Sequence, residues 1–170
     1  VEEEVKDNKT AKEFISKGNQ VIRNGHDIIK QLLELKELED APMTLRYENV
    51  KLPDFVQSIT NEFRAYAQQK KINIVEHVSD EAITLDTMMI KRIMDNLLSN
   101  AIKFSPLNRK VEITATTTDT HVVFEVRDEG PGFQQQDIPK VFGRFQKLSA
   151  RPTGGESSHG LGLAIVHLIV

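Results

Sequence analysis

The sequence predicts an α/β sandwich domain preceded by a long amphipathic helix. Residues 1–40 repeat apolar side chains every seven positions, as helices do when they pack along their length. Residues 41–170 instead alternate β-branched segments with segments of helical periodicity. The formal net charge of −3 falls entirely on the first segment, because basic and acidic side chains balance in the second. These observations divide the chain into two units, residues 1–40 and residues 41–170.

The composition limits the classes of function. A chain of 170 residues with 39% hydrophobic and 28% charged residues can bury a core and is not wholly disordered. It has no cysteine, which excludes disulfides, thiolate metal sites and a thiol nucleophile. The small net charge does not indicate the basic surface that binds nucleic acid, and no apolar run approaches the roughly 18–20 residues of a membrane span. We therefore expect a cytoplasmic chain, and leave open whether a longer parent protein is membrane-anchored.

We expect residues 5–39 to form one helix that needs a partner, ended by Asp40-Ala41-Pro42. An isolated helix is marginal in water, and it cannot bury an apolar seam against itself. The alternative is an amphipathic helix that packs on its own domain. We predict self-association through the seam, which consists of Phe14, Val21, Ile28 and Leu35.

The first half of the second unit is expected to contain two helices and two strands. A short extended piece at 45–52 leads into a helix at 53–70, whose apolar residues recur at helical spacing. Segments 72–78 and 83–85 have the β-branched content of strands. A helix follows at 86–104 and is stopped by Ser105-Pro106. Its expected core face consists of Ile90, Ile93, Leu97, Ala101 and Phe104.

The second half is expected to begin with a hairpin. Segments 111–118 and 121–127 are predicted strands, and the short Asp119-Thr120 connection favours antiparallel pairing. Residues 137–142 predict a short helix. Residues 148–160 are rich in Ser, Gly and Pro without an apolar period, which predicts a loop, and a last helix begins at Leu161.

The helix predicted at 86–104 carries a polar line beside its apolar face. Asn96, Asn100 and Lys103 share this line at about 100° per residue. Asn is unfavourable inside a helix, because its side chain competes for backbone groups. Its amide oxygen is, however, a hard ligand suited to Mg²⁺, and a lysine on the same line could meet a phosphate. A solvated helix face is the alternative interpretation.

Two glycine-containing segments add to this line. Residues 128–133 follow a predicted strand, and their glycines permit close approach beside Asp128, whose carboxylate could accept an exocyclic amino group. An ordinary Asp/Gly turn is the alternative. Residues 154–163 run into a helix N-terminus, which favours anions, and a mobile surface loop is the alternative. Neither segment matches a P-loop or a Rossmann fingerprint.

The three features in this order closely resemble the ATP-binding domain of the sensor histidine kinases of two-component systems, within the gyrase, Hsp90, histidine kinase and MutL superfamily. Residues 96–105 resemble its N box, 128–132 its first glycine box, 141–145 its phenylalanine box and 160–163 its second glycine box. Residues 5–39 resemble the second helix of the dimerisation hairpin. The resemblance implies a two-layer sandwich whose mixed sheet is covered by helices on one face.

The resemblance also implies ligands and roles. ATP and Mg²⁺ would bind, with Asn100 ligating the metal, and Asn96 and Lys103 would be the catalytic residues that face the phosphates and the metal's waters. Asp128 would accept the adenine amino group. Residues 148–159 would form the ATP lid. The other implied nucleotide contacts are Phe104, Gly130, Gly132, Phe133, Lys147, His159, Gly160, Leu161, Gly162 and Leu163.

Asn96 favours a kinase over an ATPase. Hydrolytic relatives place a Glu at this position to activate water, and Asn has no proton-accepting carboxylate. The expected activity is that of a protein-histidine kinase, which phosphorylates a hairpin of its own or a partner chain for relay to a response regulator. The alternatives are a non-catalytic nucleotide-binding or dimerisation module and a serine-directed kinase of the anti-sigma type.

The sequence departs from the family in two places. The acceptor box of the His-Glu-Leu-Arg-Thr-Pro type, expected on the first hairpin helix, is not found. Of the histidines, His26 alone has the acidic follower of acceptor sites, but a solvent-facing helix position is the better interpretation. The sequence also stops at Val170, before the closing strands that the family implies. We therefore expect a fragment that is inactive in autophosphorylation alone.

Overall fold

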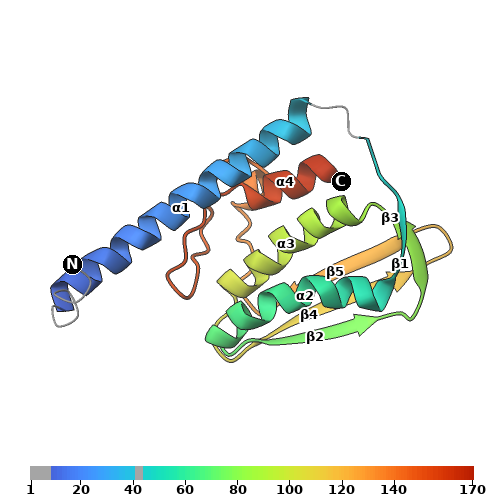
Figure 1. Cartoon of the computed structure of the whole chain (residues 1–170), viewed down its shortest axis with the longest axis horizontal. Coiled ribbons are helices and arrows are strands. Elements are labelled where there is room, and N and C mark those ends of the chain that lie inside the picture. Colours follow the sequence, from blue (N-terminus) through green and yellow to red (C-terminus); the bar gives the residue numbers. More distant parts are fainter. Residues whose placement is uncertain (1–8, 41–43) are drawn as a thin grey trace.

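The computed structural model describes residues 9–40 and 44–170. A long N-terminal helix, α1 (Lys9–Asp40), stands beside an α/β domain that holds the rest of the described chain (Figure 1). The helix is confirmed over its described length. Its predicted start near residue 5, and Ala41 and Pro42 at its predicted end, lie outside the described residues.

The α/β domain is a two-layer sandwich, as predicted. Its main sheet has the strand order β2 (Asn73–Val78), β4 (Lys110–Thr117) and β5 (Val122–Asp128), with β2 parallel to β4 and β4 antiparallel to β5. The sheet is therefore mixed, and its last two strands form the predicted hairpin. Helices α2 (Leu52–Gln69) and α3 (Thr87–Phe104) cover one face (Figure 1). Against them β4 buries alternate side chains, namely Val111, Ile113 and Ala115.

A separate two-stranded sheet closes one end of the core. Strand β1 (Glu48–Lys51) pairs antiparallel with β3 (Ala82–Leu85), and these segments are far apart in the sequence. The extended piece predicted at 45–52 is thus shorter as a strand, because α2 already begins at Leu52. Leu52 is fully buried, which fixes the join of strand and helix to the core.

Helix α3 is rotated relative to the prediction. Its buried residues are Met94, Leu98, Ala101 and Ile102, and of the predicted core face only Ala101 is among them. The predicted face was therefore wrong for Leu97 and Phe104, which line a cavity instead. The apolar arc of α3 is wide enough to serve both a core and a cavity wall, and apolar spacing alone does not distinguish the two.

The predicted helix at 137–142 is wrong in type and length. The structure has a 3₁₀ helix there, η1 (Ile138–Lys140), of three residues. Pro139 lacks an amide hydrogen, and Gly143 follows within one turn, so a longer α-helix has little support. The loop predicted at 148–160 is confirmed as irregular, and the last helix, α4, spans Gly162–Ile169.

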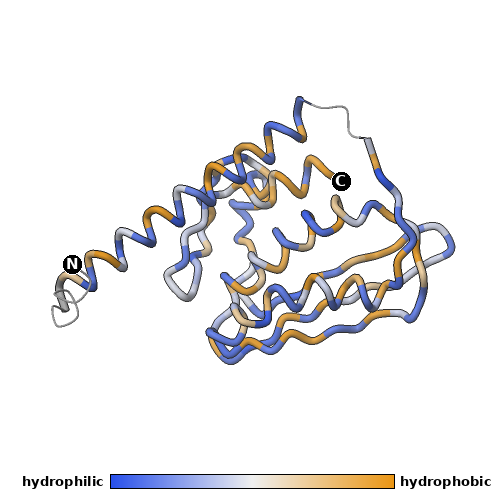
Figure 2. Tube along the Cα trace, in the orientation of Figure 1, coloured by the Kyte–Doolittle hydropathy of each residue, from blue (hydrophilic) through white to orange (hydrophobic). Residues whose placement is uncertain are grey.

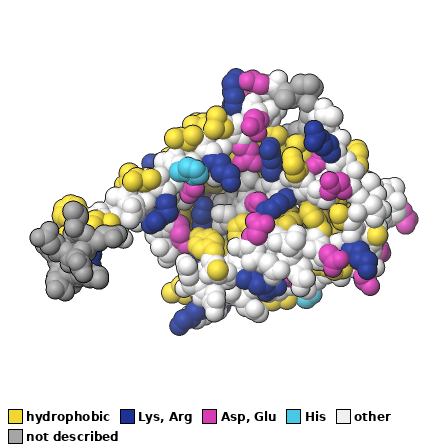
Figure 3. Space-filling model, in the orientation of Figure 1, with side chains coloured by type: hydrophobic (Ala, Val, Ile, Leu, Met, Phe, Trp, Pro, Cys, Tyr) yellow, Lys and Arg dark blue, Asp and Glu magenta, His cyan; other side chains and the backbone are white. Residues whose placement is uncertain are grey.

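Helix α1 packs on the domain by its C-terminal part only. Leu35 is 3% exposed and belongs to a small apolar cluster with Leu161 and Ile165 at the start of α4. Phe14 and Val21 are 73% and 69% exposed. Apolar residues recur along α1 and alternate with hydrophilic ones (Figure 2), and several lie on the surface (Figure 3). The predicted self-association seam is therefore wrong for Leu35, which the domain already covers.

Polar contacts fasten the same part of α1. Arg144 pairs with Glu39, and Arg92 on α3 lies 3.6 Å from both Glu34 and Glu37.

None of the described helices is long and apolar enough to cross a membrane.

Candidate active site

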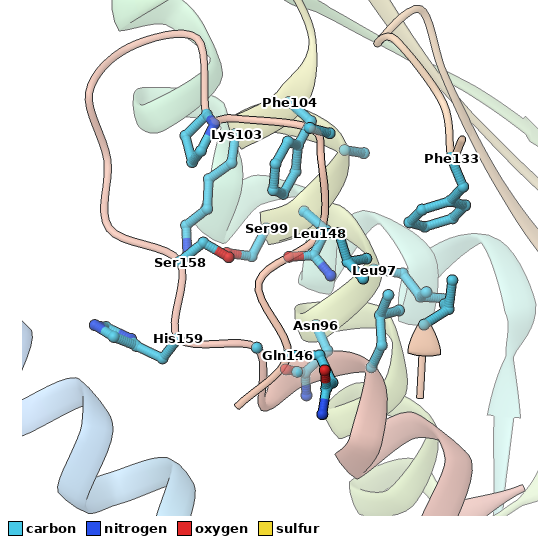
Figure 4. Close-up of a pocket in the computed structure, with 18 of the residues that line it drawn as sticks. Asn96, Leu97, Ser99, Lys103, Phe104, Phe133, Gln146, Leu148, Ser158 and His159 are labelled. Carbon is cyan, nitrogen blue, oxygen red and sulfur yellow. The ribbon is translucent and has the colours of Figure 1, made fainter. Parts of the chain in front are cut away.

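A cavity of about 290 Å³ opens between α3, the segment after β5 and the segment that runs from η1 into α4. It brings together stretches that are far apart in the sequence, as Figure 4 shows for its labelled residues. The sequence-predicted residues that line it are Asn96, Asn100, Lys103, Phe104, Asp128, Gly132, Phe133, Lys147, His159, Gly160, Leu161, Gly162 and Leu163.

The floor of the cavity is the polar line of α3. The side-chain amide of Asn96 donates to the Arg92 carbonyl oxygen at 2.8 Å. Its other end faces Gly162, where an added Cβ would lie 2.7 Å from Asn96 Oδ1. Gly162 thus lets α4 begin directly against the asparagine. Asn96 and Asn100 are half-buried in this contact, which differs from a solvated helix face.

Lys103 and His159 lie at one end of the cavity. Burial lowers the pKa of Lys103, although the negative charges of Asp27 and Glu156 oppose this shift. Burial and the neighbouring Lys103 also lower the pKa of His159, and Asp27 again opposes the shift. Figure 4 shows His159 on the lid between α3 and α1. A partly buried ammonium beside an imidazole favours an anion. Negative charge at this end would offset the cost of burying the Lys103 ammonium and its repulsion of a protonated His159.

The opposite end follows β5. The Gly130 amide donates to Asp128 Oδ1 at 2.7 Å, and Phe133 lies across the cavity from Lys103 (Figure 4). Gly132 has a φ of +66°, which an L side chain would strain. Gly130 does not line the cavity; an added Cβ there would lie 3.0 Å from the Phe104 carbonyl oxygen. It lets the loop lie against the end of α3.

The second glycine box fixes the far end of the lid. Gly160 has a φ of +68°, and an added Cβ would lie 2.5 Å from the Gln146 carbonyl oxygen. Its own carbonyl accepts a hydrogen bond of 2.9 Å from the Phe145 amide. The phenylalanine box in turn packs on α4, where the Phe142 and His167 rings stack with centroids 4.9 Å apart. The last two boxes therefore hold each other in place.

The cavity also contains residues that sequence reasoning missed. Gln31 reaches it from α1, and Gln146, Arg151 and Ser158 come from the segment around the lid. Arg151 carried a signal, because it is a cation inside the predicted lid. Gln31 carried none, since its place depends on how α1 docks. His26 is not among the cavity residues and its side chain is 77% exposed, which agrees with a solvent-facing position.

Residues 85–170, which contain α3, the hairpin, the lid and α4, match the family described as histidine kinase-, DNA gyrase B-, and HSP90-like ATPase. The chain belongs to this family. The curated relatives that it matches include sensor histidine kinases and sensor proteins, and the chain spans less than a third of the length of two of them. The domain is thus the ATP-binding catalytic domain of the sensor histidine kinase type.

Individual relatives agree on this assignment. The chain is similar to the sensor histidine kinase TmoS of Ectopseudomonas mendocina, with 32% identity over 85% of this chain and 15% of the relative. The Acinetobacter baumannii histidine kinase AdeS superimposes with a TM-score of 0.72, 26% identity and coverage of 96% of this chain and 74% of that one. Full-length ShkA in complex with AMPPNP shares the fold, with a TM-score of 0.77, 24% identity and coverage of 94% and 33%.

The cavity residues fit a magnesium nucleotide. Mg²⁺ is bound by one or two protein oxygens together with substrate phosphates and waters. The half-buried amides of Asn96 and Asn100 offer such oxygens, and Lys103 places positive charge one turn further along α3. The donor set therefore suits an ion that arrives with the phosphates.

Proposed function

We propose that this chain transfers the γ-phosphoryl group of ATP to a histidine of a dimerisation hairpin, for relay to a response regulator. In this reaction a ring nitrogen of the acceptor histidine attacks the γ-phosphorus, and the bond to the β–γ bridging oxygen breaks to release ADP. The observation that carries the proposal is the convergence of Asn96, Asn100 and Lys103 on a cavity that Gly160 and Gly162 also line, where α4 begins.

Phosphoryl transfer depends mainly on positioning and charge neutralisation, and the cavity offers both. We assign the metal to Asn100, and the phosphates to Lys103, Lys147 and His159. Bound Mg²⁺ would supply further neutralisation of the phosphate charge. Asn96 has no carboxylate that could accept a proton, and its side-chain amide is bound to the Arg92 carbonyl oxygen, so it orients rather than activates water. This favours a protein acceptor over hydrolysis.

The purine end would be bound by the residues after β5. One oxygen of Asp128 accepts from the Gly130 amide, and the other is assigned to the adenine amino group. Phe104, Phe133 and Gly132 line the space beside it, and Gly130 keeps the loop close. We expect Asp128→Asn to weaken ATP binding at least about tenfold, because the amide presents a donor toward a donor. Calorimetric titration measures this, with Asp119→Asn in the hairpin turn as the matched control.

The hairpin would come from its own or a partner chain in the cytoplasm, and α1 would supply its second helix within a homodimer. The exposed apolar residues of α1 support an unpaired helix. The alternative is a non-catalytic nucleotide-binding or dimerisation module, which would have the same cavity but would not transfer the phosphoryl group.

One experiment separates the candidates. The protein is mixed with an acceptor hairpin and γ-labelled ATP, and the labelled product is treated with acid and with base. An acid-labile, base-stable product is a phosphohistidine and supports the proposal. Acid-stable label would indicate a serine-directed kinase, and no label with intact ATP binding would leave the binding module.

A variant of Asn100 tests the assignment of the metal to this residue. Asn100→Ala removes the oxygen assigned to the metal, so we expect loss of Mg-ATP binding in calorimetry and of labelling. Asn61→Ala, in an exposed position of α2, is the matched asparagine control and should retain both. Unchanged Mg-ATP affinity in Asn100→Ala would contradict the assignment.

A further inference from the structure

A buried lysine lies beneath the lid, outside the cavity. Lys70, just after α2, is 5% exposed. Its ammonium donates to the carbonyl oxygens of Ile102 and Lys103 at 2.7 and 2.9 Å and to Thr153 Oγ1 at 2.7 Å. The Glu156 carboxylate lies 3.2 Å away. One side chain therefore joins the end of α3 to two positions of the lid.

The lid side of this junction has its own hydrogen bonds. The Thr153 amide donates to the Lys103 carbonyl oxygen at 3.0 Å, and the Thr153 hydroxyl donates to the Ser105 carbonyl oxygen at 2.6 Å. Glu156 accepts from the Tyr66 hydroxyl at 3.0 Å and from the Gly154 amide at 2.8 Å. We refer to Tyr66, Lys70, Thr153 and Glu156 as the lid anchor.

The protonation states suit this network. Burial and the neighbouring Glu156 carboxylate raise the pKa of Tyr66 well above its ordinary value, so the phenol remains a donor. Burial alone would raise the pKa of Glu156, but hydrogen bonds from its own amide and from Tyr66 and Lys70 outweigh it and lower the pKa. The carboxylate is therefore charged at neutral pH.

The chemistry of α3 explains why a lysine stands here. The last carbonyls of a helix lack intrahelical partners, and a cation is favourable at this end. A buried ammonium is costly unless hydrogen bonds satisfy it, and here three oxygen atoms accept from it beside a carboxylate. Loss of the ammonium would leave carbonyls of α3 and the carboxylate of Glu156 without this partner.

The junction is next to the phosphate end of the cavity. Lys103 gives its carbonyl to the lid anchor, while its side chain lines the cavity. His159 follows Glu156 by three residues and lines the same end. Any movement of the lid relative to α3 would change the position of His159 with respect to Lys103.

We propose that Lys70 is a positioning residue, which holds the lid in register with α3 so that Lys103 and His159 face the same phosphates. The proposal rests on the proposed function for the identity of the ligand. Lys70 itself does not line the cavity, and it acts through Thr153 and Glu156. The nucleotide site is thus assembled partly by a residue that no nucleotide touches.

Hydrogen exchange of the nucleotide-free protein tests the lid directly. In Lys70→Met we expect the amides of Thr153 and Gly154 to exchange at least about tenfold faster, because the lid loses the ammonium that ties it to the end of α3 and opens more often. The amides of β4 should be unchanged. Lys71→Met, the neighbouring exposed lysine, is the matched control. Unchanged exchange in the lid would overturn the proposal.

A second variant covers the case in which Lys70→Met does not fold. Glu156→Gln removes the lid carboxylate but leaves the bonds from Lys70 to α3, so the thermal midpoint should change little while exchange in the lid still rises. ATP titration of the same variant should show a dissociation constant raised at least about tenfold. A loosened lid with unaltered ATP affinity would reduce Lys70 to a structural role and overturn the proposal.

The two proposals fail separately. If the unmodified chain does not bind ATP, the proposed function is lost, and the lid exchange of Lys70→Met still reports whether the anchor holds the lid. If the unmodified chain binds ATP and both variants bind it equally well, the proposed function stands and the role of Lys70 is wrong.

Discussion

Gly155 and Gly160, which lie before and after His159 in the sequence, differ in the space around them. Both have left-handed backbones, with φ of +76° and +68°. An added Cβ at Gly155 meets nothing within 4 Å, whereas at Gly160 it lies 2.5 Å from the Gln146 carbonyl oxygen. The pair therefore separates backbone strain from steric overlap.

We expect Gly155→Ala to lower the free energy of unfolding by about 1 kcal/mol, from backbone strain alone. Gly160→Ala should cost roughly 1–3 kcal/mol more, because the methyl group overlaps a backbone atom that cannot move freely. Urea unfolding of the two variants and the unmodified protein measures both values. Equal losses would mean that the segment around Gln146 yields to the methyl group.

Individual site residues could be predicted where their chemistry does not suit a core. Asn96, Asn100 and Asp128 are of this kind, and all three line the cavity. Apolar spacing placed Leu97 and Phe104 in the core, because an apolar residue looks the same in a core and in a cavity wall, and only the family resemblance assigned Phe104 to the nucleotide. Lys70 was missed for another reason: its four polar partners lie far from it in the sequence and meet it only in the folded chain.

Helix α3 depends on the residue that precedes it as well as on its core. Asp86 precedes α3 and accepts from the Met89 amide at 2.9 Å and from the Arg46 amide at 2.7 Å. The bond from Arg46, and then that from Met89, hold the pKa of the Asp86 carboxyl below its ordinary value. One carboxylate therefore caps the helix and fastens the segment before β1.

This arrangement predicts a dependence of stability on pH. Because the folded pKa lies below the unfolded value of 3.8, the stabilisation by Asp86 is present above pH 3.8 and is lost as the pH falls through the folded pKa. Asp86→Ala should lower the free energy of unfolding by about 1–2 kcal/mol at neutral pH and weaken its dependence on acid. Urea unfolding at a series of pH values from neutral to well below 3.8 measures this loss, and the exposed Asp80→Ala is the control. If the free energy of unfolding of Asp86→Ala fell with decreasing pH as steeply as that of the unmodified protein, the prediction would be wrong.

The elements that local patterns govern were predicted and those that distant contacts govern were not. The β4–β5 hairpin follows from a short connection between two β-branched segments, and α2 and α3 follow from their apolar spacing. The pairing of β1 with β3 joins segments separated by a whole helix and strand, so local sequence does not specify it.

At the scale of the molecule, α1 has two parts with different surroundings. Its C-terminal part is held by the apolar cluster around Leu35 and by ion pairs of Glu34, Glu37 and Glu39. Its N-terminal part presents Phe14 and Val21 to solvent. The sequence pattern was uniform along the helix, so it could not show that α4 covers one end of the seam and leaves the other end uncovered.

The exposed part predicts self-association through a shorter seam than the sequence indicated. Exposed apolar residues on one helix favour a partner of the same kind, because burial in a helix pair removes them from water. Val21→Glu places a charge in that seam and should shift the sedimentation profile to monomer at concentrations where the unmodified chain associates. Ser16→Glu adds the same charge at an exposed position off the seam and should leave association intact. A monomeric unmodified chain at high concentration, or equal effects of both variants, would contradict the prediction and restrict α1 to its contacts with the domain.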